Sequence, residues 1–140
     1  MRDESHDTIR NGLRGPYWYG VDLDGTLAQW NMDYPGMELL EIGPPVPAMV
    51  RRVKRWIREG RIVKVFTARM ADPETGMPRC GFNASDVAHA VGMWTREHVG
   101  KYLPTTCVKD HFMVELWDDR VVQVTEGTGI PVAPYPGEET

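Results

Sequence analysis

The sequence predicts an α/β protein in which helices connect the strands of a mainly parallel sheet. Runs rich in β-favouring residues at 17–23 and 61–66 flank a helical pattern at 46–57, and a second helical pattern follows before further short strands. Parallel strands need a crossover connection, so this alternation favours a parallel sheet with helices packed on it. We therefore expect a three-layer, Rossmann-like α/β sandwich.

Composition limits the class of protein. The chain has 140 residues, enough for about one domain, and its 41% hydrophobic and 26% charged residues are typical of a globular protein. A net charge of −4 gives no general attraction for nucleic acid or an anionic membrane, although it allows a local basic patch. No apolar run approaches the about 20 residues of a membrane span, and the charged start does not resemble a signal peptide. We expect a cytoplasmic protein.

Three regions follow from the distribution of polar, proline and glycine residues. Residues 1–16 are polar and without periodicity, which predicts an N-terminal arm that is either loose or a weak helix. The pattern of strands and helices covers 17–125 and predicts the folded domain. The proline- and glycine-rich residues 126–140 predict a C-terminal tail that is either extended on the surface or disordered. Within the domain, the prolines and glycines of 27–47 predict a loop, and those of 70–82 predict a second loop over the site.

The first predicted helix has apolar residues at steps of three and four, from Val46 to Ile57. Pro47 suits its first turn and Gly60 suits its end. Five basic residues occupy the other side, namely Arg51, Arg52, Lys54, Arg55 and Arg58. A run of this kind is more often a solvated helix face than a nucleic-acid site, and we favour the solvated face here.

The second half contains one more helix and several short strands. Asn83 or Ser85 is expected to cap the helix, which should end before Gly100. Strands are expected at 104–108, 112–117 and 120–125. Their connections are too short for full helices, so we expect the last strands to pair antiparallel at an edge. Cys80 and Cys107 fit no metal or disulfide pattern and are expected to be reduced, with Cys107 packed in a strand.

Polar side chains follow each predicted strand, at the edge where ligands bind in parallel sheets. The residues are Asp22, Asp24 and Thr26 after the first strand, Thr67 and Arg69 after the second, Lys109 after the third, and Asp118, Asp119 and Arg120 after the fourth. Four converging carboxylates repel one another unless a cation is present, and their hard oxygens suit Mg²⁺. Hydroxyl and ammonium donors suit phosphate oxygens. Together these groups predict a phosphoryl-transfer site with an aspartate able to act as the nucleophile.

The block VDLDGTL at 21–27, followed by Thr67, Lys109 and then LWDD at 116–119, resembles the haloacid dehalogenase superfamily of phosphohydrolases. All four motifs of that family are present in its order, and the resemblance covers roughly 17–125. It implies a Mg²⁺-dependent phosphatase that works through an aspartyl-phosphate. No insertion is large enough for a cap domain, so the chain is similar to the compact, capless members.

The resemblance also implies a role for each residue. Asp22 is the expected nucleophile and a metal ligand, while Asp24 is the expected acid and base, with its backbone carbonyl on the metal. Side chains two residues apart in an extended chain project to the same side, which suits two carboxylates that bracket one phosphorus. Thr67 and Lys109 are expected to hold the phosphoryl oxygens. Asp118 is the preferred remaining metal ligand, and Asp119 either shares that role or supports it.

Several alternatives remain at this level. Lys101 is an alternative to Lys109 as the lysine that holds the phosphoryl oxygens. The chain also departs from many members of the superfamily, because the segment between Lys109 and Asp118 is too short for the helix that they have there. Gly25 permits the tight turn after the first strand, and Thr26 can stabilise that turn by a hydrogen bond. Thr26 and Arg69 are assigned to substrate binding. For Arg69 and Arg120, a structural salt bridge is an equally good interpretation.

The substrate also stays open. Nucleotides or a nucleic-acid terminal phosphate are expected by family analogy, small sugar or amino-acid phosphates are alternatives, and the oligomeric state is open. Trp30 and Tyr34 are candidates for stacking on a base or a sugar. Two other classes compete with a phosphatase, namely a receiver-like signalling module and a catalytically silent, metal-binding interaction domain.

Overall fold

The computed structural model describes residues 16–30 and 40–138. The predicted N-terminal arm and the segment around Tyr34 lie outside the described residues, apart from residue 16. The elements run in the order β1 (Trp18–Val21), α2 (Pro47–Arg58), β2 (Ile62–Phe66), the 3₁₀ helix η1 (Ala68–Met70), α3 (Gly81–Val99), β3 (Thr105–Thr106) and β4 (Met113–Trp117). Among the helices of this part of the chain, none is long and apolar enough to cross a membrane.

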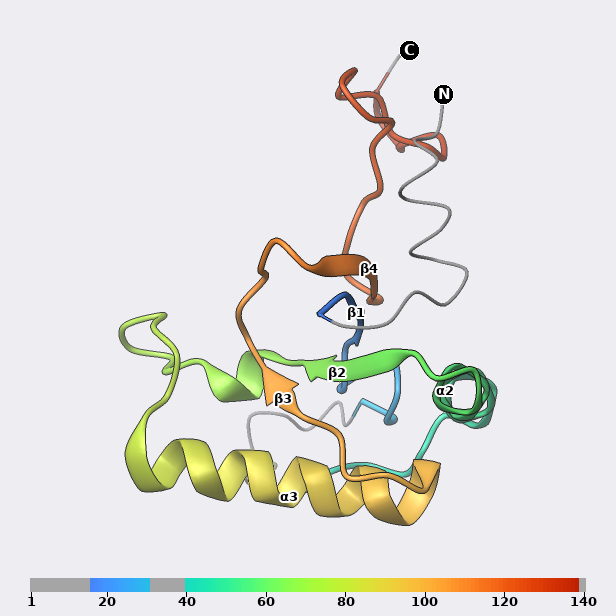
Figure 1. Cartoon of the computed structure of the whole chain (residues 1–140). Coiled ribbons are helices and arrows are strands. Elements are labelled where there is room, and N and C mark those ends of the chain that lie inside the picture. The colour runs from blue at the N-terminus through green and yellow to red at the C-terminus, as the bar shows by residue number, and fades with distance from the viewer. Residues whose placement is uncertain (1–15, 31–39, 139–140) are drawn as a thin grey trace.

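The four strands form one parallel sheet in the order β3-β2-β1-β4 (Figure 1). α2 connects β1 to β2, and α3 connects β2 to β3, so both long crossovers of the sheet are helical. The predicted α/β class and the parallel sheet are therefore confirmed.

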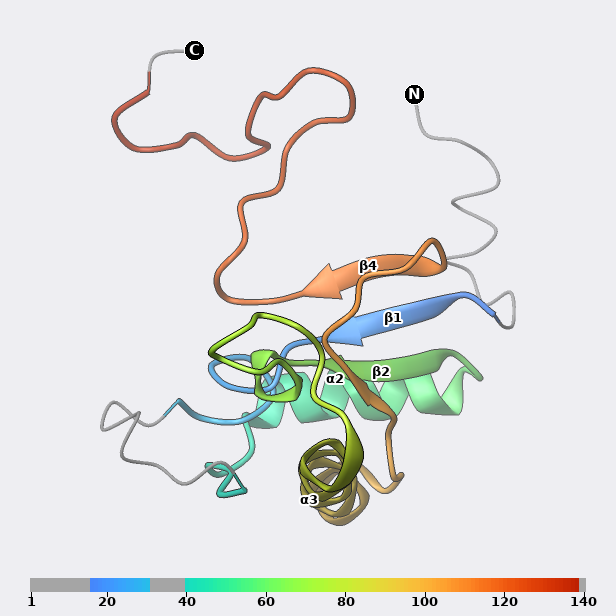
Figure 2. The same cartoon turned by 90° about the vertical axis from the view of Figure 1, so that its left-hand side faces the viewer.

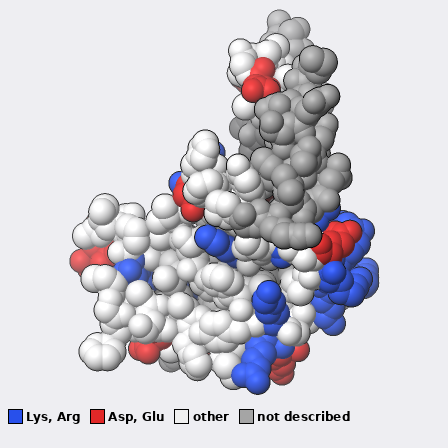
Figure 3. Space-filling model, viewed as in Figure 1, with Lys and Arg blue, Asp and Glu red and all other residues white. Residues whose placement is uncertain are grey.

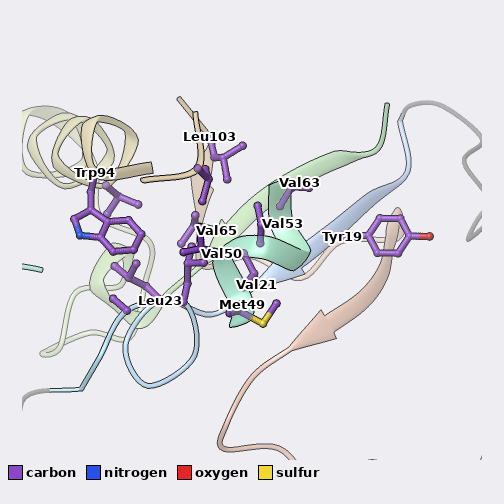
Figure 4. Close-up of a cluster of buried hydrophobic side chains, with 14 of the residues drawn as sticks. Tyr19, Val21, Leu23, Met49, Val50, Val53, Val63, Val65, Trp94 and Leu103 are labelled. Atoms are coloured by element: carbon purple, nitrogen blue, oxygen red, sulfur yellow. The ribbon is translucent and has the colours of Figure 1, made fainter. Parts of the chain in front are cut away.

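The buried core lies where one face of the sheet meets both helices (Figure 4). Tyr19, Val21, Val63 and Val65 point from β1 and β2 into this cluster. α2 adds Met49, Val50, Val53 and Trp56, and α3 adds Val87, Val91, Trp94 and Val99. In the described ranges both helices pack on this one face, so the third layer of the sandwich stays a prediction.

A short segment crosses the other face of the sheet in place of a helix. Trp18 is fully buried outside the main cluster, and its Nε1 donates to Asp110 Oδ1 at 2.8 Å. The backbone N–H of Trp18 donates to the carbonyl of Phe112 at 2.9 Å. Residues 107–112 therefore run back from the carboxyl end of β3 to the amino end of β4, as Figure 2 shows. β4 can then pair parallel with β1 without a helix, so the expected antiparallel edge pairing is wrong.

Other differences from the predictions are local. α3 begins at Gly81, directly after Cys80, and no side chain caps it, so neither Asn83 nor Ser85 has the expected role. Cys107 is a free, half-buried thiol that follows β3 rather than lying in it.

The predicted strand at 120–125 is also absent from the described structure. This segment pairs with its own continuation, because Thr125 N–H donates to the carbonyl of Ile130 and Val132 N–H to that of Gln123. Its valines are more than half exposed, so they gain no sheet packing that would favour a strand.

Candidate active site

A cavity of about 1000 Å³ opens at the carboxyl edge of the sheet. Its walls include residues that follow three of the strands, namely Asp22 and Asp24 after β1, Thr67 and Arg69 after β2, and Asp118, Asp119 and Arg120 after β4. The loop after η1 closes one side through Asp72, Pro73, Gly76 and Arg79. The expected loop over the site therefore does line the cavity, and Trp30 lines it as well.

The chain turns sharply after β1, and this turn places the first two aspartates. Leu27 N–H donates to the carbonyl of Asp22 at 3.2 Å, and Ala28 N–H to that of Leu23 at 2.8 Å. Gly25 has a φ of 92°, in the region that residues with a side chain rarely adopt. A Cβ on Gly25 would also lie 2.5 Å from Asp119 Oδ2. A glycine is therefore required at this position both by the turn and by the close approach of Asp119.

Asp22, Asp118 and Asp119 form an acidic triad. One carboxylate oxygen of each lies within 4.8 Å of the others. Burial, with smaller contributions from the neighbouring Asp118 and Asp119, raises the pKa of Asp22 from 3.8 to about 8. A carboxyl held protonated by its surroundings at neutral pH becomes ionised when a cation binds beside it. The oxygen donors and their mutual repulsion therefore fit a hard divalent cation.

Thr26 connects two members of the triad. Its Oγ1 lies 3.2 Å from Asp22 Oδ2 and 3.2 Å from Asp119 Oδ1, and it accepts the backbone N–H of Asp119 at 3.1 Å. The hydroxyl thus ties the turn after β1 to the turn after β4. Thr26 does not line the cavity, so these contacts give it a positioning role.

Asp24 stands apart from the triad because Arg69 engages it. Arg69 Nε donates to Asp24 Oδ2 and Nη2 donates to Oδ1, both at 2.8 Å. Arg69 Nη1 also donates to the carbonyl of Glu41 at 2.6 Å. The side chains of Arg69 and Asp24 are only 7% and 14% exposed. The structure shows the salt bridge of Arg69, while substrate binding by this residue, which also lines the cavity, stays a prediction.

The two predicted phosphate-binding residues differ in position. Thr67 is buried against the cavity, and its Oγ1 accepts the N–H of Arg69 at 3.1 Å. Lys109 is exposed, does not line the cavity, and takes part in no ion pair within the described residues. It lies two residues beyond Cys107, in the segment that leads from β3 back toward the amino end of β4, and its role at phosphate stays a prediction. Lys101 is also exposed and follows α3.

Arg79 and Cys107 are cavity residues that sequence reasoning did not select. Arg79 Nε donates to the carbonyl of Arg69 at 2.7 Å and so fixes η1 to the loop beyond it. The prediction of a loop over the site included Arg79, but nothing in the local pattern singles it out. Cys107 was missed because the strand predicted at 104–108 included it, whereas β3 ends at Thr106.

A scan against models of protein families gave no match for this chain, and searches of curated proteins and of solved structures gave none either.

Proposed function

We propose that this protein is a Mg²⁺-dependent phosphomonoesterase that acts through an aspartyl-phosphate on Asp22, with a capless fold like that of the haloacid dehalogenase superfamily. The observation that supports this proposal most strongly is the position of Asp22, at the end of β1 in a cavity with two further carboxylates. Buried Thr67 lies in the wall of the same cavity as a donor for phosphate oxygens.

Asp22, Asp118 and Asp119 would hold the cation, and the backbone carbonyl of Asp24 is a further candidate ligand. When bound, Mg²⁺ neutralises negative charge on the carboxylates and on the phosphoryl oxygens. The acidic triad fits this ion but does not distinguish it from another hard divalent cation.

The side chains then have separate tasks. A carboxylate oxygen of Asp22 attacks phosphorus, and the bond from phosphorus to the ester oxygen breaks with its electron pair on that oxygen. Asp24 gives the departing oxygen a proton, and later accepts one from the water that attacks the phosphorus of the aspartyl-phosphate. The bond from phosphorus to Asp22 then breaks with its electron pair on the carboxylate oxygen, which releases phosphate and restores Asp22. Arg69 must release at least one oxygen of Asp24 for this proton transfer, since both oxygens accept hydrogen bonds from it.

Lys109 keeps its proposed role as a phosphate contact only if residues 107–112 approach the cavity when substrate binds. Substitution of Lys109 by methionine tests this role, and we expect it to raise KM for the phosphate ester. The volume of the cavity suits a ligand of nucleotide size. Nucleotides and nucleic-acid terminal phosphates are therefore our proposed substrates, ahead of small sugar or amino-acid phosphates.

Hydrolysis of p-nitrophenyl phosphate tests the proposal. We expect turnover that requires Mg²⁺, is lost on addition of EDTA and is absent from Asp22→Asn. The Asp86→Asn variant is the matched control, because Asp86 is an exposed carboxylate on α3. Activity that survives in folded Asp22→Asn would exclude Asp22 as the nucleophile.

A metal-binding interaction domain without turnover is the second candidate. It is favoured by the engaged carboxylate of Asp24 and by the exposed position of Lys109. Binding of Mg²⁺ without phosphate release from any ester in a screen of nucleotides, oligonucleotide ends and sugar phosphates would select this candidate.

A further inference from the structure

Helix α2 carries the most basic surface of the described fold. Its twelve residues contain no acidic side chain, and five basic ones, namely Arg51, Arg52, Lys54, Arg55 and Arg58. All of these except half-buried Arg52 are exposed. Figure 3 shows Lys and Arg side chains gathered on the side of the molecule where α2 lies. The whole chain has a net charge of −4, so this surface is a local reversal of the overall charge.

Within residues 16–30 and 40–138, no ion pair joins a basic side chain of α2 to an acidic neighbour. The ion pairs of the described residues join Arg61 to Glu59, Arg69 to Asp24 and His98 to Glu97, and none of them includes a basic residue of α2. Four of the five residues are arginines, whose planar guanidinium groups suit phosphate oxygens. A polyanion that contacts this helix therefore displaces no internal ion pair in this part of the chain.

The opposite side of α2 argues against insertion of this helix into a membrane interface. Met49, Val50, Val53 and Trp56 are buried against the sheet. A helix that binds in a membrane interface buries its apolar side among the lipid chains, and α2 has no apolar side left for this purpose. The surface therefore suits an anionic polymer in water better than a bilayer.

The basic surface also begins beside the cavity. Arg52 lies over the indole of Trp117, with its Cζ 4.6 Å from the ring centroid. Trp117 is the last residue of β4, and Asp118 of the acidic triad follows it directly. From Arg51 to Arg58 the helix rises about 10 Å, so its basic side chains form a row along the helix.

We propose that α2 binds the sugar-phosphate backbone of a nucleic acid strand. The exposed residues Arg51, Lys54, Arg55 and Arg58 contact the phosphates, and Arg52 lies over Trp117, the residue before Asp118 of the acidic triad. This binding needs neither a metal ion nor catalysis, so it stands apart from the proposed function. A strand bound in this way would also bring its end toward the acidic triad.

Fluorescence anisotropy with a labelled DNA single strand of about 20 nucleotides tests this inference, in EDTA, at salt concentrations from about 50 to 200 mM. The duplex of the same sequence is the second probe. Arg51→Gln/Arg55→Gln removes two charges from the surface, and Arg96→Gln/Lys101→Gln is the matched control, since it removes two exposed charges near the end of α3. For a single strand, each lost phosphate contact makes the plot of log binding constant against log salt concentration less steep by about 0.7. The α2 variant loses two contacts, and we expect it to bind about tenfold more weakly than the wild type.

The control variant should bind as the wild type does. The proposal would be overturned if the wild type bound neither the single strand nor the duplex. An equal loss of affinity in the α2 variant and in the control variant would also overturn it. Sedimentation with phosphatidylcholine vesicles, with and without phosphatidylserine, tests the membrane alternative. Binding to the anionic vesicles that is lost in the α2 variant would overturn the assignment to nucleic acid, and absence of such binding supports it.

Discussion

Arg69 holds both carboxylate oxygens of Asp24, through Nε and Nη2, at 2.8 Å each. Because Nη1 of the same guanidinium donates to the carbonyl of Glu41, Arg69 connects three segments at the mouth of the cavity, namely the turn after β1, the chain before α2, and η1. Both side chains of the pair are largely buried. This ion pair therefore fixes Asp24 beside Asp22 and keeps it out of the acidic triad.

Removal of Arg69 should destabilise the fold strongly. Arg69→Ala leaves the carboxylate of Asp24 buried without its partner, and we expect a loss of about 3 kcal/mol in the free energy of unfolding. Arg69→Lys keeps the charge but not the paired hydrogen bonds, so we expect a smaller loss. Urea denaturation measures both changes. Equal midpoints for Arg69→Ala and the wild type would show that the pair contributes little to stability.

The stability of the metal-free protein should fall as pH rises toward 8. The carboxyl of Asp22 ionises near its ordinary pKa of 3.8 in the unfolded chain, but at about 8 in the folded one. The folded state thus binds more protons between these values, and rising pH favours the unfolded state. Urea denaturation in EDTA should show this decline in the wild type and a weaker one in Asp22→Asn. A parallel pH dependence in the two proteins would contradict the cause assigned to it.

Mg²⁺ should stabilise the wild type through the acidic triad. A ligand that binds only the folded state raises the free energy of unfolding by RT ln(1 + [L]/Kd). The melting temperature should therefore rise with the concentration of Mg²⁺. Asp118→Asn should remove most of this rise, because the triad then has two carboxylates. Asp86→Asn, on the surface of α3, should keep all of it. An undiminished rise in Asp118→Asn would place the metal elsewhere.

Gly25 should matter for the metal as well as for the backbone. Gly25→Ala forces a side chain into a positive φ and against Asp119 Oδ2, and we expect weaker Mg²⁺ binding because Asp119 must move. Gly60 has a similar φ of 81° with open space around its missing Cβ. Gly60→Ala should therefore lose about 1 kcal/mol of stability, with unchanged Mg²⁺ affinity. Isothermal titration with Mg²⁺ compares the two, and equal affinities would show that Asp119 is not a ligand.

The sequence predicted much of the fold because, over the long elements, the spacing of apolar residues agrees with the prolines and glycines that mark the ends of helices and strands. Pro47 and a regular apolar spacing defined α2 closely, and the apolar run at 61–66 defined β2. The end of the chain was harder to predict. The valines at 121, 122 and 124 favour a strand, but the chain leaves the sheet after β4, which is already its edge strand. Residues 120–125 therefore have no neighbouring strand to pair with.

The site was predictable where a residue directly follows a strand. Asp22, Thr67 and Asp118 all lie in the cavity, because the carboxyl ends of parallel strands meet at one edge. The position of Lys109 was not predictable in this way. It depends on the path of residues 107–112 across the far face of the sheet, where Trp18 donates to Asp110, 92 residues away in the sequence.

The most direct test of the central claim is the detection of phosphate on Asp22. The protein is mixed with a phosphate ester and Mg²⁺, quenched with acid during turnover, and digested for mass spectrometry. We predict one added phosphoryl group on Asp22 itself, in the peptide that contains YWYGVDLDGT, and none on Asp24 or on the Asp22→Asn variant. Phosphate on a different residue, or turnover without any phosphorylated aspartate, would contradict the assignment of Asp22 as the nucleophile.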